Sequence, residues 1–399
     1  MDLETFRWLL TPQGQGLLSE AGRIHAGHPG DPVAAMAALR SAAPSATAEQ
    51  AAAAMTQETL RARGVDKFGA DAVRMYFTPD GLEQATRPRV ADHRAARLVA
   101  ADVASVVDLG CGIGGDLVAL ARAGLTAVGV DLDPVRVAIA EANLAALGLE
   151  GAVGVADATT LDLSPFGAAF ADPARRSGSG RVMDAEGWTP PWPFVAQLLE
   201  RPGARAVVKV APGIPHALVP GGTEAEWVSV AGEVKEAALW SPALATVGRR
   251  ATVIGPGGLA TLTEEDDPYD GQRRPVRELG EFLYEPDGAV IRARLVTAVA
   301  AGVQGGLLDA HIAYVTSDMG FRSPFARAYR VVEELPFREK QLKAALRARD
   351  IGVLSIKKRG VRVDPASLRR RLALSGASSA TLVLTRRAGS GIALLVEPV

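Results

Sequence analysis

Four aspartates in the first half of the chain each stand at the end of a short apolar segment. They are Asp108, Asp131, Asp157 and Asp172. The apolar segments alternate with helical patterns, which predicts parallel strands whose carboxyl ends lie along one edge of a sheet. Carboxylates accept hydrogen bonds from hydroxyl and amino groups and pair with cations. The spacing therefore predicts one ligand site with four carboxylates, although a single aspartate could instead cap a helix.

The glycines that follow Asp108 indicate the kind of ligand. Residues 108–114 read Asp-Leu-Gly-Cys-Gly-Ile-Gly, with Gly110, Gly112 and Gly114 in a turn between a strand and a helix. Such a turn lets a ligand approach the backbone, and it is typical of nucleotide-binding βαβ units, although an α/β domain without a ligand can also contain one. The Asp108 carboxylate would repel a phosphate. A nucleoside with a cationic end fits better, and S-adenosylmethionine carries both an ammonium and a sulfonium.

The same turn, with a second acid at the end of the next strand, resembles the first motif of class I methyltransferases. These enzymes use S-adenosylmethionine as their cofactor. The resemblance implies that Asp108 binds the cofactor's ammonium and Asp131 its ribose hydroxyls. It also implies that Asp157, with the backbone of Ala158, binds the adenine amino group. The three glycines of the turn complete the expected cofactor site.

Asp172 begins the sequence Asp-Pro-Ala-Arg-Arg at the end of the fourth predicted strand. The transferred methyl group should meet its acceptor there, so we predict Asp172, Pro173 and Arg175 as catalytic residues. Asp172 would orient the acceptor, and Arg175 with Arg176 could clamp a phosphate, unless these arginines form surface salt bridges. Lys209, at the end of the fifth strand, is a weaker candidate.

The Asp-Pro-Ala-Arg sequence differs from two related loops. Methyltransferases of exocyclic amines often carry Asp/Asn-Pro-Pro-aromatic, and their side-chain oxygen and a proline carbonyl accept from the amine. Here Ala174 and Arg175 stand in the last two positions, which disfavours amino methylation. Asp-Pro-x-Arg also resembles the loop of uridine C5 methyltransferases, which need a cysteine nucleophile after it. No cysteine follows Cys111, so that mechanism is excluded unless another residue substitutes.

Composition excludes several classes of protein. The chain has 399 residues, 48% hydrophobic and 22% charged, as expected for a globular protein of two or three domains. The single cysteine excludes a disulfide framework, and the five histidines show no metal-ligand spacing, so we assign no metal. The start of the chain lacks a signal-peptide pattern, and no apolar run is long enough for a membrane span. We therefore expect a cytoplasmic protein.

The charge is uneven along the chain. Residues 336–399 contain 14 Lys and Arg against 4 Asp and Glu, a net charge of +10, whereas the whole chain has a net charge of −1. A basic segment on an acidic body suggests a polyanion partner, although it could also be a solvated face or contact the acidic body within the chain. We predict RNA as the partner. The basic residues that we expect to contact it are Lys357, Lys358, Arg359, Arg369, Arg370 and Arg371.

The apolar patterns also predict the elements that position these residues. Helices are expected at 3–10, 33–42, 47–63, 114–123, 134–147, 192–201, 289–301, 337–349 and 365–374. Strands are expected at 104–108, 127–131, 152–156, 168–172, 205–210, 227–230 or 234–240, 251–254, 282–284, 311–316, 352–357, 380–386 and 391–396. Thr47 followed by Gln50 predicts a capping box, and Pro79–Gly81 predicts a turn. The late strands have no helix between them, which suggests an antiparallel hairpin at the end of a parallel sheet.

The whole chain resembles a bacterial group of class I methyltransferases with a C-terminal THUMP-like domain. The resemblance depends on the glycine turn, on Asp-Pro-Ala-Arg-Arg, and on Leu82-Glu-Gln-Ala-Thr86. It also depends on Tyr284-Glu-Pro-Asp-Gly-Ala-Val-Ile-Arg292 and on the basic segment. It implies an α/β protein with a Rossmann-like class I methyltransferase sheet, an N-terminal helical region and a small C-terminal α+β region, ferredoxin-like plus THUMP-like. The expected divisions are 1–100 (helical), 101–265 (methyltransferase), 266–335 (linker and ferredoxin-like unit) and 336–399 (THUMP-like).

These observations favour a methyltransferase that acts on structured RNA, such as tRNA or rRNA. True THUMP domains recognise RNA, and the scarcity of aromatic residues in the basic segment favours recognition of shape and phosphates over base stacking. Two alternatives stay open: a methyltransferase of a small molecule or protein, and a non-catalytic module that binds the cofactor or RNA. A dehydrogenase is disfavoured, because Asp108 precedes the turn and no third glycine stands at the dinucleotide spacing.

Overall fold

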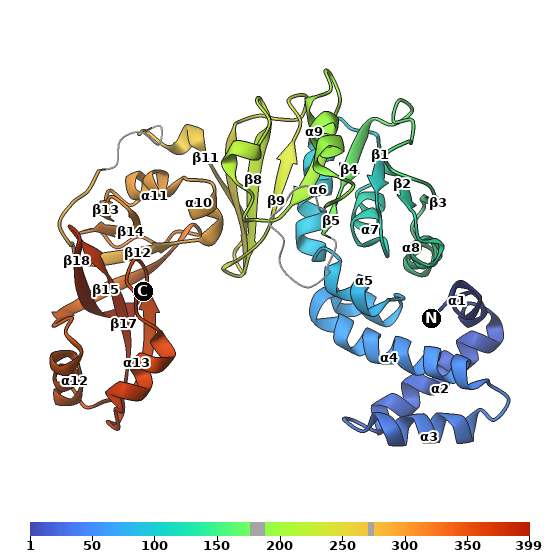
Figure 1. The fold of residues 1–399 in the computed structure, drawn as a ribbon, viewed down its shortest axis with the longest axis horizontal. Helices are drawn as coiled ribbons and strands as arrows, with labels where there is room; N and C mark the ends of the chain where they lie inside the picture. The colour runs from blue at the N-terminus through green and yellow to red at the C-terminus, as the bar shows by residue number, and fades with distance from the viewer. Residues whose placement is uncertain (176–187, 270–274) are drawn as a thin grey trace. The chain divides into compact units, whose positions relative to one another are not determined.

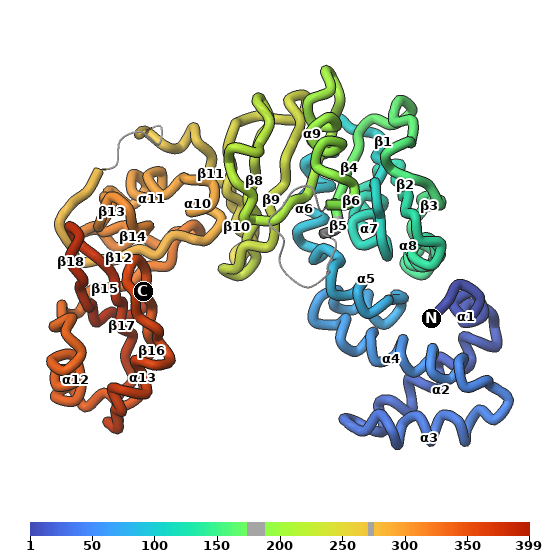
Figure 2. Tube along the Cα trace, in the orientation of Figure 1, coloured from blue at the N-terminus to red at the C-terminus, as the bar shows by residue number. Residues whose placement is uncertain are grey.

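The computed structural model describes residues 1–175, 188–269 and 275–399. The chain divides into two compact units, and each is described here by itself (Figures 1 and 2). Unit 1 consists of Met1–Val210 and Leu239–Leu244, and unit 2 of Ala211–Ala238 and Ala245–Val399. In the described part of the chain, no helix is long and apolar enough to cross a membrane.

Unit 1 begins with a group of helices, coloured blue in Figure 1. They are α1 (Leu3–Leu9), α2 (Pro12–Gly27), α3 (Pro32–Ala42), α4 (Ala48–Phe68), the 3-10 turn η1 (Gly69–Val73), α5 (Pro79–Gln84) and α6 (Pro88–Ala100). The capping box at Thr47 and Gln50 is confirmed: each side chain bonds the other's backbone N–H, at 3.2 and 2.9 Å. Helix α2 was not predicted, because its four glycines weaken the helical pattern.

The turn predicted at Pro79–Gly81 is wrong, because α5 begins there. The Thr78 hydroxyl accepts from the Gly81 N–H at 3.0 Å, and Pro79 occupies the first helical turn. Proline is tolerated at this position, since the first N–H groups of a helix have no partner within it. A Pro-Asp-Gly sequence therefore starts a helix here instead of making a turn.

The N-terminal helices pack onto the methyltransferase part of unit 1. Their buried core, which includes Phe6, Leu60 and Phe77, also contains Ile113 and Ile139 from the following domain. The buried Asn143 amide connects the two parts through hydrogen bonds at both ends. Its oxygen accepts from Tyr76 N at 2.7 Å, and its nitrogen donates to Tyr76 O at 3.1 Å and to Ile113 O at 2.8 Å.

The centre of unit 1 is a parallel sheet with helices between its strands. The strands are β1 (Ser105–Leu109), β2 (Thr126–Asp131), β3 (Ala152–Val155), β4 (Ala168–Ala171) and β7 (Ala206–Val210); the helices are α7 (Gly115–Arg122), α8 (Pro134–Leu147) and α9 (Trp192–Glu200). These strands pair in the order β7-β4-β1-β2-β3. Two short strands, β5 (Ala174–Arg175) and β6 (Trp188–Thr189), pair separately. The predicted α/β fold is confirmed.

The first strands of unit 2 pair in the order β11-β10-β8. They are β8 (Glu224–Val230), β9 (Glu233–Trp240), β10 (Arg249–Gly255) and β11 (Gly258–Thr263), with 3-10 turns η3 (His216–Leu218) and η4 (Glu264–Asp266). Both alternative strands of the sequence exist. Ala231 and Gly232 join β8 to β9 with φ of 52° and 85°, as in a two-residue hairpin turn. The predicted antiparallel hairpin is therefore present, and β11 is an additional strand.

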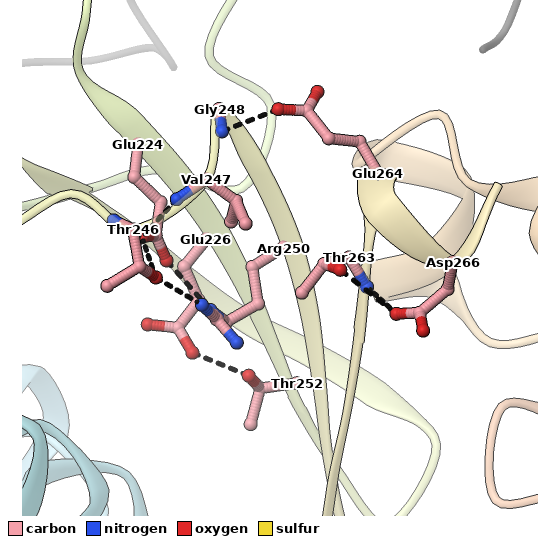
Figure 3. A network of polar contacts seen from close by, with 10 residues as sticks. All are labelled: Glu224, Glu226, Thr246, Val247, Gly248, Arg250, Thr252, Thr263, Glu264 and Asp266. Carbon is pink, nitrogen blue, oxygen red and sulfur yellow. Dashed lines mark hydrogen bonds and ion pairs between the residues drawn. The ribbon is translucent and has the colours of Figure 1, made fainter.

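Buried carboxylates in β8 are satisfied by neighbouring groups, as Figure 3 shows. Glu224, fully buried, accepts from Arg250 Nε at 2.7 Å and from the backbone of Thr246 at 2.9 Å. Glu226, also buried, accepts from the Thr252 hydroxyl at 2.5 Å. A buried charge is costly without such partners. This polar network therefore stabilises the parallel pair of β8 and β10.

The rest of unit 2 is one seven-stranded sheet with four helices. The elements are β12 (Phe282–Pro286), α10 (Gly288–Arg292), α11 (Val296–Gly302), β13 (Gly306–Asp309), β14 (Ile312–Ser317), β15 (Ala326–Leu335), α12 (Glu339–Ala348), β16 (Ile351–Lys358), α13 (Pro365–Leu372), β17 (Ser378–Arg387) and β18 (Ser390–Pro398). Their order is β13-β14-β12-β15-β18-β17-β16. Strand β15 pairs with both β12 and β18, so the segments 266–335 and 336–399 contribute to one sheet.

Two details of this sheet differ from the sequence expectations. The helix predicted at 289–301 is two helices, because Arg294 has a φ of 60° between them. Strands β13 and β15 were not predicted. A ferredoxin-like unit has the order β-α-β-β-α-β, but residues 318–325, which the structure describes, form no second helix before β15. The unit therefore keeps only the β-α-β-β part of that pattern, β12 to β14.

Candidate active site

The turn after β1 lies where the sequence predicts a ligand site. Gly110, Gly112 and Gly114 have φ of 89°, 56° and 83°, a region that favours glycine. A Cβ added to Gly110 or Gly112 would meet no atom within 4 Å, so both face open space. A pocket at this turn is lined by Asp108, Asp116, Arg136, Phe170 and Asp172, by residues of the glycine turn, and by Gly81, Gln84 and Ala85.

Asp108 is the buried acid of this pocket. Its residue is only 2% exposed, and its Oδ2 has no hydrogen-bond partner. Burial raises the pKa of Asp108 well above the ordinary value, and the neighbouring acids Asp116, Asp172 and Asp131 raise it further. Arg94 opposes this shift. A cationic group in the pocket would supply the missing partner, so the residues fit the ammonium of S-adenosylmethionine.

Asp131 holds the glycine turn in place. Its Oδ2 accepts from Gly112 N at 3.0 Å and its Oδ1 accepts from Asp133 N at 2.9 Å, while Arg136 lies 4.0 Å away. Each carboxylate oxygen has two lone pairs, so these bonds leave acceptor capacity for hydroxyl groups. The side chain is 9% exposed at the end of β2. This geometry is compatible with the predicted ribose contact.

Asp157 lies outside the residues that line the pocket. It is exposed, and its Oδ1 accepts from the N–H and hydroxyl of Thr159 at 2.8 and 2.7 Å, which lowers the pKa of Asp157. Ala158, the next residue, is half-buried. Asp131 is also absent from the residues that line the pocket, so of the four predicted acids only Asp108 and Asp172 line it.

Asp172 follows β4 and pairs with Lys209 at the end of β7. The distance between Asp172 Oδ2 and Lys209 Nζ is 2.5 Å, and Nζ also lies 3.0 Å from the Thr86 hydroxyl. The two charged side chains are 33% and 16% exposed. Lys209, the weaker candidate of the sequence, is therefore in direct contact with the predicted acceptor-orienting residue.

The other residues of the Asp-Pro-Ala-Arg-Arg sequence are less informative. Pro173 is buried beside Asp172. Arg175 belongs to β5, where its backbone is paired with Trp188. Arg176 lies outside the described residues.

Helix α5 lines one side of the pocket, which the sequence analysis did not predict. Gly81 packs so closely that a Cβ there would lie 2.5 Å from Ile113 Cγ2. Lys67 holds the end of α5 by donating to the carbonyls of Leu82 and Glu83, at 2.7 and 2.8 Å. Burial, with the charges of Lys209 and Arg87, lowers the pKa of Lys67 to about 8. The polar sequence Leu82-Glu-Gln-Ala-Thr86 is the sequence feature that could have indicated this contribution of α5 to the pocket.

A buried ion pair supports the floor of the pocket. Arg94, from α6, pairs with Asp116, from α7, and its guanidinium lies 4.3 Å from the centre of the Phe170 ring. Both charged residues are buried. Breaking such a pair would leave an uncompensated buried charge, so it fixes α6 against the cofactor turn.

The basic residues predicted to contact RNA have different surroundings in unit 2. Lys357 pairs with Glu285 at 2.6 Å and Arg371 with Glu339 at 3.0 Å. Arg369, exposed, donates from Nε to Leu354 O at 3.0 Å, and Arg359 is half-buried. Lys358 and Arg370 are exposed at the surface, and Arg370 donates to the Ser367 hydroxyl at 3.0 Å.

The parallel sheet, its glycine turn and the unpartnered Asp108 define a class I methyltransferase domain. A family model described as a methyltransferase domain matches residues 106–172, and one described as THUMP domain-like matches residues 326–398. A domain of unknown function matches residues 2–64. Within the described residues, no cluster of His, Cys, Asp or Glu could hold a metal ion.

Two curated relatives, from two strains of Mycobacterium tuberculosis, are each named an uncharacterized S-adenosylmethionine-dependent methyltransferase. Each is 39% identical over 342 residues, which is 82% of this chain and 90% of the relative. The chain belongs to this family of S-adenosylmethionine-dependent methyltransferases, with a THUMP-like domain at its C-terminal side. It is an enzyme, and S-adenosylmethionine is its cofactor.

A solved structure shows the same fold over nearly the whole chain. It is a putative methyltransferase from Porphyromonas gingivalis W83, 21% identical, with a TM-score of 0.73. The match covers 96% of this chain and 98% of the other. The fold of this chain therefore recurs in that protein.

Proposed function

We propose that this methyltransferase acts on structured RNA, such as tRNA or rRNA, and that its THUMP-like domain binds that RNA. The observation that carries the proposal is the net charge of +10 on residues 336–399, within a domain similar to THUMP domains. Clustered Lys and Arg neutralise phosphates and release counterions, which favours nucleic acid. An RNA substrate also agrees with the proposed cytoplasmic location.

Exposed cations in this domain are the proposed phosphate contacts. Lys358, Arg362, Arg369 and Arg370 are exposed on and beside β16 and α13. Lys357 and Arg371 already pair with carboxylates, so they add less to binding than the sequence alone suggests. Because cations without a carboxylate partner gain most from a phosphate, we rank Lys358, Arg362 and Arg370 above these two.

At the cofactor site we propose the roles predicted from the sequence. Asp108 binds the ammonium, Asp131 the ribose hydroxyls, and Asp157 with Ala158 the adenine. Asp172 orients the acceptor next to Pro173, and Arg175 clamps a phosphate of the substrate. The cofactor supplies a methyl group on a sulfonium, which is electrophilic. The chain's own contribution is alignment: Lys209 fixes Asp172, and α5 encloses the glycine turn.

The test is transfer of labelled methyl groups from S-adenosylmethionine into total RNA from a strain that lacks the gene. Nucleoside mass spectrometry of that RNA should show one new methylated nucleoside. Label found only in protein or in small molecules would contradict the proposal and favour the alternative substrates. Absence of turnover with tight cofactor binding would favour the non-catalytic alternative.

A charge variant tests the RNA-binding part separately. We expect Lys358→Gln, Arg362→Gln and Arg370→Gln together to weaken RNA binding and to lower the slope of log K against log salt by roughly 0.7–0.9 for each lost phosphate contact. The matched control removes three ion-paired surface arginines, through Arg23→Gln, Arg330→Gln and Arg349→Gln. An equal loss in the control would show that net charge, and not this surface, binds RNA.

A further inference from the structure

Four buried polar groups without partners gather in one corner of the seven-stranded sheet. In the described part of the chain, these atoms have no hydrogen-bond partner: Tyr314 Oη, Arg359 Nε, Thr385 Oγ1 and Arg386 Nε. Tyr314 and Thr385 are fully buried residues, and the two arginines are half-buried. Buried polar groups in proteins nearly always have a partner, so four orphans together need an explanation.

Strand register shows that these groups are neighbours. Lys358 in β16 is aligned with Leu384 in β17, and Arg359 N donates to Leu384 O at 3.0 Å. The next residues, Arg359 and Thr385, therefore lie side by side. The Arg359 guanidinium also lies 5.4 Å from the centre of the Tyr314 ring, in β14.

Gly360 brings Arg386 to the same corner. Its φ is 74°, and a Cβ there would lie 2.0 Å from Ile312 Cδ1 and 3.6 Å from Arg386 Nε. Glycine lets the chain turn this close to Ile312 in β14, and it leaves the Arg386 side chain at contact distance. We call the four residues Tyr314, Arg359, Thr385 and Arg386 the arginine corner.

The charges around the arginine corner favour an anion. Nearby, Lys357 is neutralised by Glu285 at 2.6 Å. Backbone hydrogen bonds from His311 N at 2.9 Å and Gly389 N at 3.4 Å lower the pKa of Asp309, and the charge of Arg386 lowers this pKa further. In the described chain, Arg359 and Arg386 form no ion pair, so one positive charge remains after Asp309 is counted.

We propose that the arginine corner binds a phosphate-class oxyanion. Every orphan group in it can donate a hydrogen bond: two guanidinium N–H groups and two hydroxyls. Their common complement is an acceptor-rich anion, and guanidinium groups recognise phosphate oxygens through charge-assisted hydrogen bonds. A neutral ligand would leave the excess positive charge unbalanced.

The phosphate could come from the RNA or from a free phosphate compound. The first source rests on the proposed function, because it makes the arginine corner one contact of the bound RNA. The binding of phosphate itself does not depend on methyl transfer. The two proposals can therefore fail separately.

The experiment uses the full chain and inorganic phosphate as the probe, at constant ionic strength with chloride. Calorimetry should show phosphate binding that Arg359→Gln with Arg386→Gln weakens by about tenfold or more, since charge-assisted hydrogen bonds are lost. Tyr314→Phe removes one hydroxyl only and should weaken binding by a smaller factor. The matched control, Arg330→Gln with Arg349→Gln, removes two arginines paired with carboxylates and should bind as the wild type does.

Three results would overturn the assignment: no phosphate binding to the wild type, equal binding to the arginine and control variants, or an unchanged affinity in Tyr314→Phe together with an arginine variant that fails to fold.

Measurement of RNA binding by the same variants is the second part of the test. A loss of RNA affinity in the arginine variant beyond that of the control supports RNA as the source. Lost phosphate binding with unchanged RNA affinity overturns that source and supports a free phosphate compound, whereas phosphate binding without any RNA methylation counts against the proposed function only.

Discussion

Two carboxylates at the ends of neighbouring strands in unit 1 have opposite surroundings. The Asp108 side chain is buried, and its Oδ2 has no hydrogen-bond partner. The Asp172 side chain is one-third exposed, and its Oδ2 lies 2.5 Å from Lys209 Nζ. Their strands, β1 and β4, are adjacent in the sheet. A buried acid without a partner is costly until a cation arrives, whereas the Asp172 carboxylate already has a cationic partner. This contrast supports the proposal that Asp108 serves cofactor binding and that Asp172 serves the acceptor.

The largest expected effect is that of Asp172→Asn. If the carboxylate orients the acceptor or takes its proton, the rate of methyl transfer should fall by on the order of 10²–10⁴. The dissociation constant of S-adenosylmethionine should change little, because Asp108 is the proposed partner of the cofactor's cation. Labelled methyl transfer and calorimetry measure the two quantities. A variant that loses cofactor affinity as strongly as activity would break the comparison.

Asp108→Asn should show the reverse pattern. We expect the cofactor's dissociation constant to rise on the order of 30-fold or more, because one partner of a buried ion pair is lost. The ligand-free protein should at the same time melt at a higher temperature, since an unpaired buried charge is removed. Calorimetry and a thermal melt test this pair of changes. A lower melting temperature would show that Asp108 has a structural partner.

The pH dependence follows from the raised pKa of Asp108. A carboxyl whose folded pKa lies above its unfolded value stabilises the folded protein at low pH, and this contribution is lost as the pH rises through the folded pKa. Cofactor binding needs the ionised form, so affinity should increase over the same pH range. Titration of binding against pH should show this increase in the wild type and not in Asp108→Asn.

Lys209→Met tests the pairing that distinguishes the two acids. Without the cation, the Asp172 carboxylate loses the hydrogen-bond partner at 2.5 Å that fixes its orientation. We expect the rate of methyl transfer to fall about tenfold, because the group that orients the acceptor is then misplaced, while the dissociation constant of S-adenosylmethionine changes little. Lys209→Arg should restore part of the activity. An unchanged rate of methyl transfer in Lys209→Met would reduce Lys209 to a structural role.

The smallest effect concerns the wall beside Asp108. Gly81→Ala would place a Cβ 2.5 Å from Ile113 Cγ2 and 2.7 Å from the Thr78 hydroxyl. Such overpacking costs about 1–3 kcal/mol, so the free energy of unfolding should fall and cofactor affinity should weaken a few-fold. Gly16→Ala is the control, since its Cβ would meet nothing within 4 Å. Denaturant unfolding compares the two, and equal stability of both variants would show that α5 moves freely.

Much of the cofactor domain could be predicted because its signals are local. The glycine turn, the acids at the ends of β1, β2 and β4, and helix α8 all lie in segments whose own residues define them. The RNA candidates were less predictable, because a residue's partners come from other strands. Lys357 reads as a free cation in the sequence, yet Glu285, 72 residues away, pairs with it. The positions of Asp131 and Asp157 outside the pocket lining could not be read from their spacing either.

The sequence by itself determined the methyltransferase class, because Asp-Leu-Gly-Cys-Gly-Ile-Gly restricts both the backbone of the turn and the charge that it presents to a ligand. Only the tertiary structure decided which groups lack partners. Asp108 Oδ2 is unsatisfied because α5, α6 and the neighbouring strands enclose it, and the arginine corner exists because β14, β16 and β17 bring four donors together. Whether a polar group has a hydrogen-bond or ion-pair partner depends on residues far away in the sequence, so it is decided only when distant segments pack together.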